Sequence, residues 1–312
     1  MGERALVRRI SEILGGIESE DCALIWAGDR YLVATTDMLH RKTDFPEIMN
    51  PWQIGWMTAA VNLSDIAAMG AEPAGLLVAA GLPPETDLCL IDELFCGLQE
   101  CAACYGTRVL GGDTDAHDEL TLTGCALGFV ERDLVLLRRG AHAGDLLCTT
   151  GALGGAGGGL LALERRDLEN DLVPLLLEPQ PRVTEGRALA LSRSVTSMMD
   201  NSDGLALSLW DLSEASGVGF VVREKDLPIA PGLEEMVGHR EAVELVMGAG
   251  GDFELLFTVP PDRLEEARRA CRLTVIGRAV DEGVWLESGG RRIGVEPEGY
   301  EHRIGCKGSY RF

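Results

Sequence analysis

Five short segments that combine aspartate with glycine, serine or threonine are spread along the chain, and a fold that uses them must bring distant residues together. They are residues 20–23, 35–37, 62–65, 111–114 and 200–204. Carboxylates and hydroxyls are the hard oxygen ligands that Mg²⁺ prefers, and an ion shared with substrate phosphates needs only one or two carboxylates. One such segment alone is typical of a turn or a helix cap. Together they predict a single metal and phosphate site that holds several ions.

The negative charge of the chain limits its ligands. It has 50 Asp plus Glu against 28 Lys plus Arg, a formal net charge of -22 at pH 7. Such a chain lacks the basic surface that binds DNA or RNA, so we expect no nucleic-acid partner. A phosphate ester would need divalent cations to bridge it to the carboxylates. The alternative interpretation is that the acidity reflects only solubility or a salty cytoplasm.

Length and hydropathy indicate two domains in a cytoplasmic protein. The 312 residues are 46% hydrophobic, which is enough for a large core divided between two domains. Residues 1–16 predict an amphipathic helix rather than a signal peptide. The most apolar run, residues 67–83, is interrupted by Glu72 and Pro73, so we expect no membrane span. Nine cysteines without a disulfide framework indicate reduced thiols.

The first half of the chain predicts strands mixed with helices, with adjacent strands antiparallel. A hairpin is expected over residues 22–35, and its second strand ends just before Asp37. Pro51 begins a helix that ends at Gly70. The other expected elements are strands at 74–81, 107–110 and 120–130 and a helix at 91–105.

Two polar residues of the helix that begins at Pro51 need a reason. Asn62 and Asp65 are three residues apart and share a face, yet both are poor helix formers. A solvated face would explain them, but their neighbours in residues 59–68 are mostly apolar. We therefore interpret Asp65 as a metal ligand.

The second half is also predicted to be mixed α/β, and we place the domain boundary near residue 140, giving domains 1–140 and 141–312. The glycine-rich run at 151–159 lacks the Lys-Ser or Lys-Thr of a nucleotide loop, so a flexible turn before a helix at 160–166 is favoured. Further helices are expected at 184–192 and 204–216, and strands at 145–150, 219–222, 254–259, 273–279 and 284–287.

Taken in order, the motifs resemble the thiamine-monophosphate kinase family, within the larger group that includes aminoimidazole ribonucleotide synthetase. The most specific stretch is AVNLSDIAAMGAEP at residues 60–73, supported by GGDT at 111–114, SDGL at 202–205 and GGDFELLFT at 250–258. The resemblance implies an α+β fold of two mixed α/β domains. It also implies a homodimer in which the N-terminal domains pair their sheets into a barrel-like structure, with ATP bound at the junction.

The resemblance also assigns site residues. ATP would be contacted by Gly112, Arg138 and Ser202, and the acceptor by Asp44, Gly251 and Tyr300. Mg²⁺ ions would be held by Asp21, Thr35, Thr36, Asp37, Asp65, Asp113, Asp200 and Asp203.

The implied reaction transfers the γ-phosphoryl group of ATP to thiamine monophosphate. A phosphate monoester has a second pKa of about 6, so the acceptor oxygen is already ionised at neutral pH and needs no general base. Positioning and charge neutralisation supply most of the catalysis in phosphoryl transfer. We therefore expect direct in-line transfer assisted by Mg²⁺ at Asp37, Asp65 and Asp113, without a phosphoenzyme.

The chain departs from the family pattern where the acceptor is expected. Asp44 replaces a histidine that many members have, and Gly251 replaces a glutamate. Tyr300 is either a stacking partner for a flat cationic ring or a packing residue. Two alternatives therefore stay open: an ATP-dependent enzyme of the larger group with another acceptor, or a nucleotide- and metal-binding protein without turnover.

Overall fold

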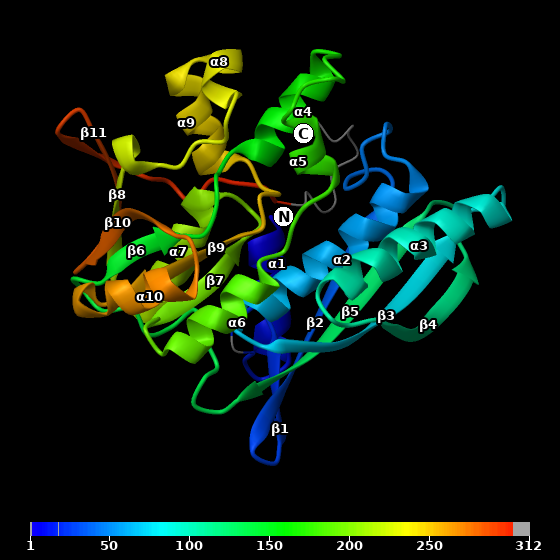
Figure 1. Cartoon of the computed structure of the whole chain (residues 1–312), viewed down its shortest axis with the longest axis horizontal. Helices are drawn as coiled ribbons and strands as arrows, with labels where there is room; N and C mark the ends of the chain where they lie inside the picture. Colours follow the sequence, from blue (N-terminus) through cyan, green and yellow to red (C-terminus); the bar gives the residue numbers. More distant parts are fainter. Residues whose placement is uncertain (1, 18, 302–312) are drawn as a thin grey trace.

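The computed structural model describes residues 2–17 and 19–301, which form two β-sheets with helices around them (Figure 1). The first sheet has the strand order β1-β2-β5-β3-β4, and the second has the order β12-β11-β8-β10-β6-β9-β7. The strands of the first sheet are β1 (Ala23–Ala27), β2 (Arg30–His40), β3 (Glu72–Leu82), β4 (Val109–Ala116) and β5 (Thr121–Glu131). Those of the second are β6 (Leu146–Thr149), β7 (Ser197–Asn201), β8 (Gly219–Arg223), β9 (Glu254–Val259), β10 (Thr274–Val280), β11 (Val284–Ser288) and β12 (Arg291–Gly294).

Ten α-helices surround these sheets in the described part of the chain. They are α1 (Glu3–Ile13), α2 (Pro51–Ala68), α3 (Leu88–Cys104), α4 (Gly155–Glu164), α5 (Val173–Leu177), α6 (Val183–Ser192), α7 (Leu205–Ser216), α8 (Leu233–Val237), α9 (His239–Gly248) and α10 (Leu264–Ala270). Among these residues no helix combines the length and hydropathy that crossing a membrane requires.

Helix α2 joins the two sheets. Pro51 occupies its first turn, and Asn50 and Gln53 form a capping box that satisfies its first N–H groups. Its side chains share one buried cluster with β5 and, from the second sheet, with β7 and β9. The approach to α6 is so close that a Cβ on Gly186 would lie 2.2 Å from the carbonyl oxygen of Ala67. Residues on α2 can therefore meet residues of both sheets.

The predicted hairpin, the α2 helix and most predicted strands are confirmed, with three corrections in the first sheet. Strand β2 continues to His40, so Asp37 lies inside the strand, because all eleven residues of β2 pair with β5. Residues 111–114 are likewise part of strand β4 and do not follow it. β4 also pairs with β3 in parallel, whereas antiparallel neighbours were expected, since α3 connects the two strands as a crossover.

The glycine-rich run is not the flexible turn that its composition indicated. Helix α4 begins at Gly155, so most of the run is helical and buried. Close packing explains the glycines: a Cβ on Gly158 would lie 2.7 Å from Leu172, and one on Gly159 would lie 2.5 Å from the carbonyl oxygen of Leu172. The run lets α4 and α5 approach each other closely.

Candidate functional site

Three aspartates from distant segments meet at the junction of the two sheets. Asp21 precedes β1, Asp65 lies on α2 and Asp200 lies on β7, and one carboxylate oxygen from each falls within 4.8 Å of the others. Thr35 on β2 donates a hydrogen bond of 2.5 Å to Asp65, and Ser64 donates one of 2.6 Å to Asp200. The structure therefore brings together four of the predicted metal-site residues, Asp21, Thr35, Asp65 and Asp200.

Asn62 on α2 has a structural role beside this cluster. Its side-chain oxygen accepts a hydrogen bond of 3.3 Å from the backbone N–H of Asp37, and its amide donates one of 3.0 Å to the carbonyl of Thr58. Space for the side chain exists because residue 124 on β5 is glycine, where a Cβ would lie 2.2 Å from the amide nitrogen of Asn62. The polar pair on α2 thus has two explanations: Asn62 fixes strand β2, and Asp65 belongs to the acidic cluster.

The acidic cluster carries more negative charge than its surroundings neutralise. Burial raises the pKa of Asp65 well above its ordinary value, and the charges of Asp37, Asp200 and Asp21 raise it further. Burial and then Asp21 raise the pKa of Asp200 to about 7, and burial raises that of Asp37 to about 6. Crowded carboxylates whose ionised forms are disfavoured in this way are typical of sites where a cation supplies the missing positive charge.

One buried carboxylate oxygen in the cluster has no partner. Asp21 has a fully buried side chain, and its Oδ1 accepts hydrogen bonds from Arg138 of 2.5 Å to Nη2 and 3.2 Å to Nε. Its Oδ2 has no hydrogen-bond partner. An orphaned carboxylate oxygen among hard oxygen donors fits Mg²⁺.

Asp113 and Gly112 lie elsewhere in the same chain. In the first sheet Asp113 is in register with Ala79, Thr123 and then Met38, so three strand spacings, about 14 Å, separate it from β2. Side chains alternate between the faces of a strand, which places Asp113 with Met38 on the face opposite Asp37. One chain therefore does not bring Asp113 to the acidic cluster.

Thr36 also lies on the face opposite Asp37. It neighbours Thr35 and Asp37 on β2, whose side chains face α2, and its own hydroxyl donates to the carbonyl of Gly124. The predicted ligands thus form two groups. One group, on the side of the first sheet that α2 covers, is Asp21, Asp37, Asp65 and Asp200. The other group, on the uncovered face, is Thr36 and Asp113.

Three predicted residues of the nucleotide and acceptor sites, together with the predicted metal ligand Asp203, converge at the segments that follow β7 and precede β9. The N–H of Gly251 donates to the carbonyl of Ser202 at 2.7 Å, and the N–H of Tyr300 donates to the carbonyl of Asp203 at 3.0 Å. A Cβ built on Gly250 would lie 3.3 Å from both Tyr300 and Asp203. Ser202, Asp203, Gly251 and Tyr300 thus border one region at the start of α7.

Asp44 is held by its own turn. Its Oδ2 accepts hydrogen bonds of 2.8 Å from the N–H of His40 and 2.7 Å from the hydroxyl of Thr43. The next residue, Phe45, belongs to the same hydrophobic cluster as Phe253. Asp44 therefore lies in a turn after β2 that is anchored in the same hydrophobic cluster as Phe253.

Sequence reasoning missed the role of Asp252. Its carboxylate accepts hydrogen bonds from the N–H groups of Gly154 (2.6 Å) and Ala156 (3.0 Å), at the first turn of α4. Burial raises its pKa to about 6, and these hydrogen bonds oppose that rise. The start of α4 is thus occupied by a carboxylate of the chain, which excludes these N–H groups as a phosphate site.

A second missed feature is the ion pair between Arg182 and Glu254. Arg182 donates to both oxygens of Glu254, at 2.7 and 2.5 Å, and Thr150 donates to the same carboxylate at 2.5 Å. Asp252 and Glu254 therefore anchor the segment around Phe253, which has a positive φ of 51°. The only signal in the sequence was an acid, Glu254, at the start of an apolar strand. Its partner Arg182 is 72 residues away, so the pair could not be predicted.

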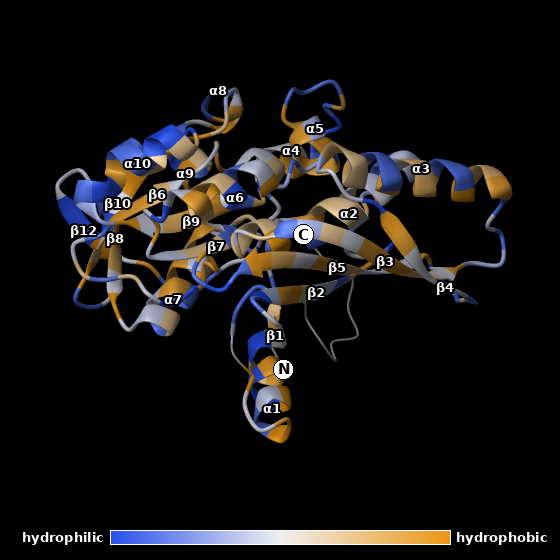
Figure 2. Ribbon diagram, turned by 60° about the horizontal axis from the view of Figure 1, so that its bottom comes forward, coloured by the Kyte–Doolittle hydropathy of each residue, from blue (hydrophilic) through white to orange (hydrophobic). Residues whose placement is uncertain are grey.

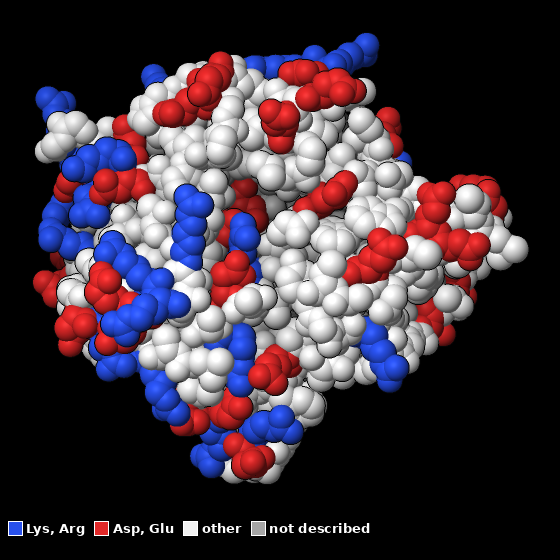
Figure 3. Space-filling model, viewed as in Figure 1, with Lys and Arg blue, Asp and Glu red and all other residues white. Residues whose placement is uncertain are grey.

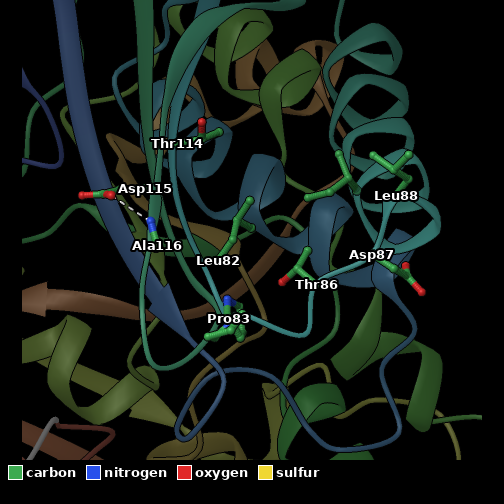
Figure 4. Close-up of a pocket in the computed structure, with 10 residues that line it drawn as sticks. Leu82, Pro83, Thr86, Asp87, Leu88, Thr114, Asp115 and Ala116 are labelled. Atoms are coloured by element: carbon green, nitrogen blue, oxygen red, sulfur yellow. Dashed lines mark hydrogen bonds between the residues drawn. The ribbon is translucent and has the colours of Figure 1, made fainter.

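An open groove of about 850 Å³ lies at the other end of the first sheet (Figure 4). It is lined by Leu82 and Pro83 at the end of β3, by Asp87 and Ile91 at the start of α3, and by Thr114 near the end of β4. Gly112 and Asp113 immediately precede Thr114 on β4. The groove is therefore next to the group of predicted ligands that lies away from the acidic cluster.

Charges are distributed unevenly over the face of the molecule that Figure 3 shows. The part formed by α3, at the right of the view, shows acidic side chains, and α3 itself contains no Lys or Arg. Basic side chains gather at the opposite side, over the second sheet. An anionic ligand near α3 would therefore need a cation as a bridge.

Comparison with known proteins gives matches along nearly the whole chain. Residues 19–130 match the family described as AIR synthase related protein, N-terminal domain, and residues 142–285 match its C-terminal domain. The thiamine-monophosphate kinase of Methanospirillum hungatei is 40% identical over 97% of this chain and 99% of its own length.

Solved structures agree with these sequence matches. The structure of AaThiL complexed with AMPPCP and TMP has a TM-score of 0.88 at 27% identity and covers 97% of each chain. Thiamine-monophosphate kinase from Stenotrophomonas maltophilia K279a has a TM-score of 0.80 at 32% identity, covering 93% of this chain and 98% of its own. The two-domain fold that the sequence predicted is confirmed.

Proposed function

The chain belongs to the thiamine-monophosphate kinase family, and we propose on this basis that it transfers the γ-phosphoryl group of ATP to thiamine monophosphate, giving thiamine diphosphate and ADP. The observation that carries the proposal is the acidic cluster of Asp21, Asp65 and Asp200, built from three distant segments at the junction of the sheets. Phosphoryl transfer between two anions needs such a cation-binding centre more than it needs a nucleophile.

Several Mg²⁺ ions fit the donor set. Asp21, Thr35, Asp37, Asp65 and Asp200 would hold them on the helix-facing side of β2, with Asp203 at the start of α7. Bound Mg²⁺ would neutralise the phosphates of ATP and the acceptor. The chain itself aligns the two substrates in line, and the ionised acceptor oxygen attacks without a general base. Arg138 and Ser202 contact the ATP phosphates from beside this cluster.

The direct test is an assay with ATP, Mg²⁺ and thiamine monophosphate that measures thiamine diphosphate. We expect product from the wild type and a loss of about 10³-fold in kcat for Asp65→Asn, because the cation loses its central carboxylate. Asp262→Asn, an exposed acid remote from the cluster, is the matched control and should keep full activity. ATP consumption without thiamine diphosphate would favour another acceptor, and ATP binding without consumption would favour a non-catalytic protein.

We further propose that the working unit is a homodimer in which Thr36 and Asp113 meet across paired sheets. Both residues lie on the uncovered face of the first sheet, where Ile25, Met38 and Leu77 are 50%, 62% and 40% exposed. Asp113 cannot reach Asp37 within one chain, whereas a second copy of the same sheet can present its own Asp113. The groove beside Thr114 would then hold the nucleoside part of ATP, with Gly112 near its phosphates.

Mixing two inactive variants tests this shared site. In the proposed shared site one chain supplies Asp65 and the other supplies Asp113. A mixed dimer of Asp65→Asn and Asp113→Asn therefore has one site with both aspartates and one site with neither. After subunit exchange we expect about a quarter of wild-type activity, since half of the dimers are mixed. Activity that stays absent in the mixture would show that each chain supplies its own Asp113.

The acceptor is proposed to lie between Asp44, Gly251 and Tyr300, beside the start of α7. Tyr300 and the 250–251 backbone border Asp203, which supports an acceptor phosphate near the acidic cluster. If Tyr300 stacks on the cationic ring, Tyr300→Ala raises KM for thiamine monophosphate about ten-fold and leaves KM for ATP unchanged. An unchanged KM would identify Tyr300 as a packing residue.

The proposal also includes the domain boundary near residue 140 and the cytoplasm as the compartment. The two sheets are built from residues on either side of residue 140. The cysteines in the described part of the chain are free thiols, which stay reduced in the cytoplasm.

A further inference from the structure

Arg138 lies between two carboxylates that belong to different parts of the fold. It pairs with Asp21 of the acidic cluster at 2.5 Å, and its Nη1 lies 3.7 Å from Oδ2 of Asp211 on α7. Its own side chain is only 18% exposed. A guanidinium held in this way can shift its charge between the two acids with a small movement.

Asp211 has a stronger partner of its own. Nη2 of Arg4, on α1, lies 2.8 Å from both oxygens of Asp211. The side chain of Asp211 is 21% exposed and that of Arg4 is 31% exposed, so water screens the pair only in part. Asp211 is therefore shared by two arginines, of which Arg4 is the closer.

A cation that binds at the acidic cluster must compete with Arg138 for Asp21. Oδ1 of Asp21 is occupied by the guanidinium, and only Oδ2 is without a partner. Like charges repel, so a cation on Oδ2 would weaken the pair between Arg138 and Asp21, and Asp211 is a second carboxylate within reach of the guanidinium.

We propose that Arg4 and Asp211 are positioning residues that set how Arg138 divides its charge between Asp211 and Asp21, and thereby how readily Asp21 accepts a divalent cation. Asp211 draws Arg138 away from Asp21, and Arg4 weakens that pull by neutralising Asp211. The inference rests on the metal site proposed above, and it extends that site to α1 and α7.

Substitutions of Arg4 and Asp211 are therefore expected to change the affinity for Mg²⁺ in opposite directions. In Asp211→Asn, Arg138 keeps only Asp21, so the half-saturating Mg²⁺ concentration rises about three- to ten-fold, the effect of one partly solvated ion pair. In Arg4→Ala, Asp211 draws Arg138 more strongly, and the half-saturating concentration falls by a similar factor. Arg4→Lys keeps the charge and should restore the wild-type value.

The measurement is the unfolding midpoint of the full-length protein, titrated with Mg²⁺ alone. Arg8→Ala is the matched control, because Arg8 joins the same two helices by pairing with Glu214 at 3.6 Å but lies outside the chain of charges. It should leave the Mg²⁺ dependence unchanged. Shifts of Asp211→Asn and Arg4→Ala in the same direction, or no shift in either, would overturn the inference.

A kinetic readout separates positioning from a general loss of structure. At a limiting Mg²⁺ concentration the KM for ATP should rise in Asp211→Asn, and saturating Mg²⁺ should return it to the wild-type value, whereas a merely structural defect would persist at saturating Mg²⁺. Because the Mg²⁺ titration contains neither nucleotide nor acceptor, opposite shifts in a protein that makes no thiamine diphosphate would disprove the proposed function and leave this inference standing.

Discussion

The two sheets of this protein differ in how many of their faces are covered. In the second sheet every residue of β7 and β9 is buried, because α6 and α10 pack on one side and α7 and α9 on the other. In the first sheet β5 alternates between buried and half-buried residues, and β4 is almost wholly exposed. The first sheet therefore keeps one face largely exposed within a single chain.

Helix α1 extends this unequal coverage. In Figure 2, α2 and α3 lie on one side of the first sheet and α1 projects on the other. Val7, Ile10 and Leu14 give α1 an exposed apolar stripe, and ion pairs such as Arg4–Asp211 connect it to α7. The second sheet is thus covered within one chain, whereas the first sheet has an uncovered face, where we propose that a second copy of the chain binds. The following experiments test that contrast.

The largest effect is expected from a charge on the uncovered face. Leu77→Asp places a carboxylate where we propose that two sheets meet, and burying an unpaired charge prevents association. Activity should fall at least about 100-fold while the chain stays folded, since residue 77 is 40% exposed in one chain. Sedimentation measures whether the variant still associates, and circular dichroism measures whether it stays folded. An active variant with unchanged mass would remove the interface from the proposal.

A core substitution in the second sheet should instead lower stability without preventing association. Phe257 on β9 is fully buried, so Phe257→Ala leaves a cavity and should lower the free energy of unfolding by about 3–5 kcal/mol. Denaturant unfolding measures the loss, and the dimer should persist below the transition. A loss under about 1 kcal/mol would contradict the dense packing of this sheet.

The junction between the sheets should respond to pH. Burial raises the pKa of Asp200 to about 7 and that of Asp37 to about 6. Between the ordinary aspartate pKa, about 3.9, and these values, the folded protein binds more protons than the unfolded chain, so stability falls as pH rises. From pH 5 to 7.5 without divalent cations we expect a loss on the order of a few kcal/mol.

Mg²⁺ should cancel this loss, because it stabilises the ionised carboxylates. Unfolding in EDTA and in excess Mg²⁺ across the same pH range is the measurement. Stability in EDTA that increases over this interval would show that the cluster is neutralised by the chain itself.

The smallest effect is expected from an exposed charge outside the proposed interface. Arg240 on α9 is 94% exposed and pairs with Glu244 at 3.0 Å. Arg240→Ala should change stability by no more than about 0.5 kcal/mol and leave mass and activity unchanged. If this variant failed to dimerise, the surface of α9 would contribute to association, and the uncovered face of the first sheet would not be the proposed interface.

Much of the fold followed from local patterns. The helix from Pro51 was predictable because a proline at its start and a glycine at its end mark both boundaries. The hairpin of β1 and β2 was predictable from two apolar runs that flank a glycine turn. By contrast, helix α4 was hidden, because glycine disfavours helix and only packing against Leu172 explains it.

The sequence alone determined that this chain carries several Mg²⁺-type ligand segments, that its charge suits cation-bridged phosphates, and that it belongs with a known group of enzymes. These properties depend only on residue types and on short spacings along the chain. Tertiary structure decided which ligands meet: Asp21, Asp65 and Asp200 converge, while Asp113 lies three strands from β2 and on the other face. The physical reason is that adjacent residues of a strand point to opposite faces, so the pairing register, which long-range contacts set, decides where each side chain lies.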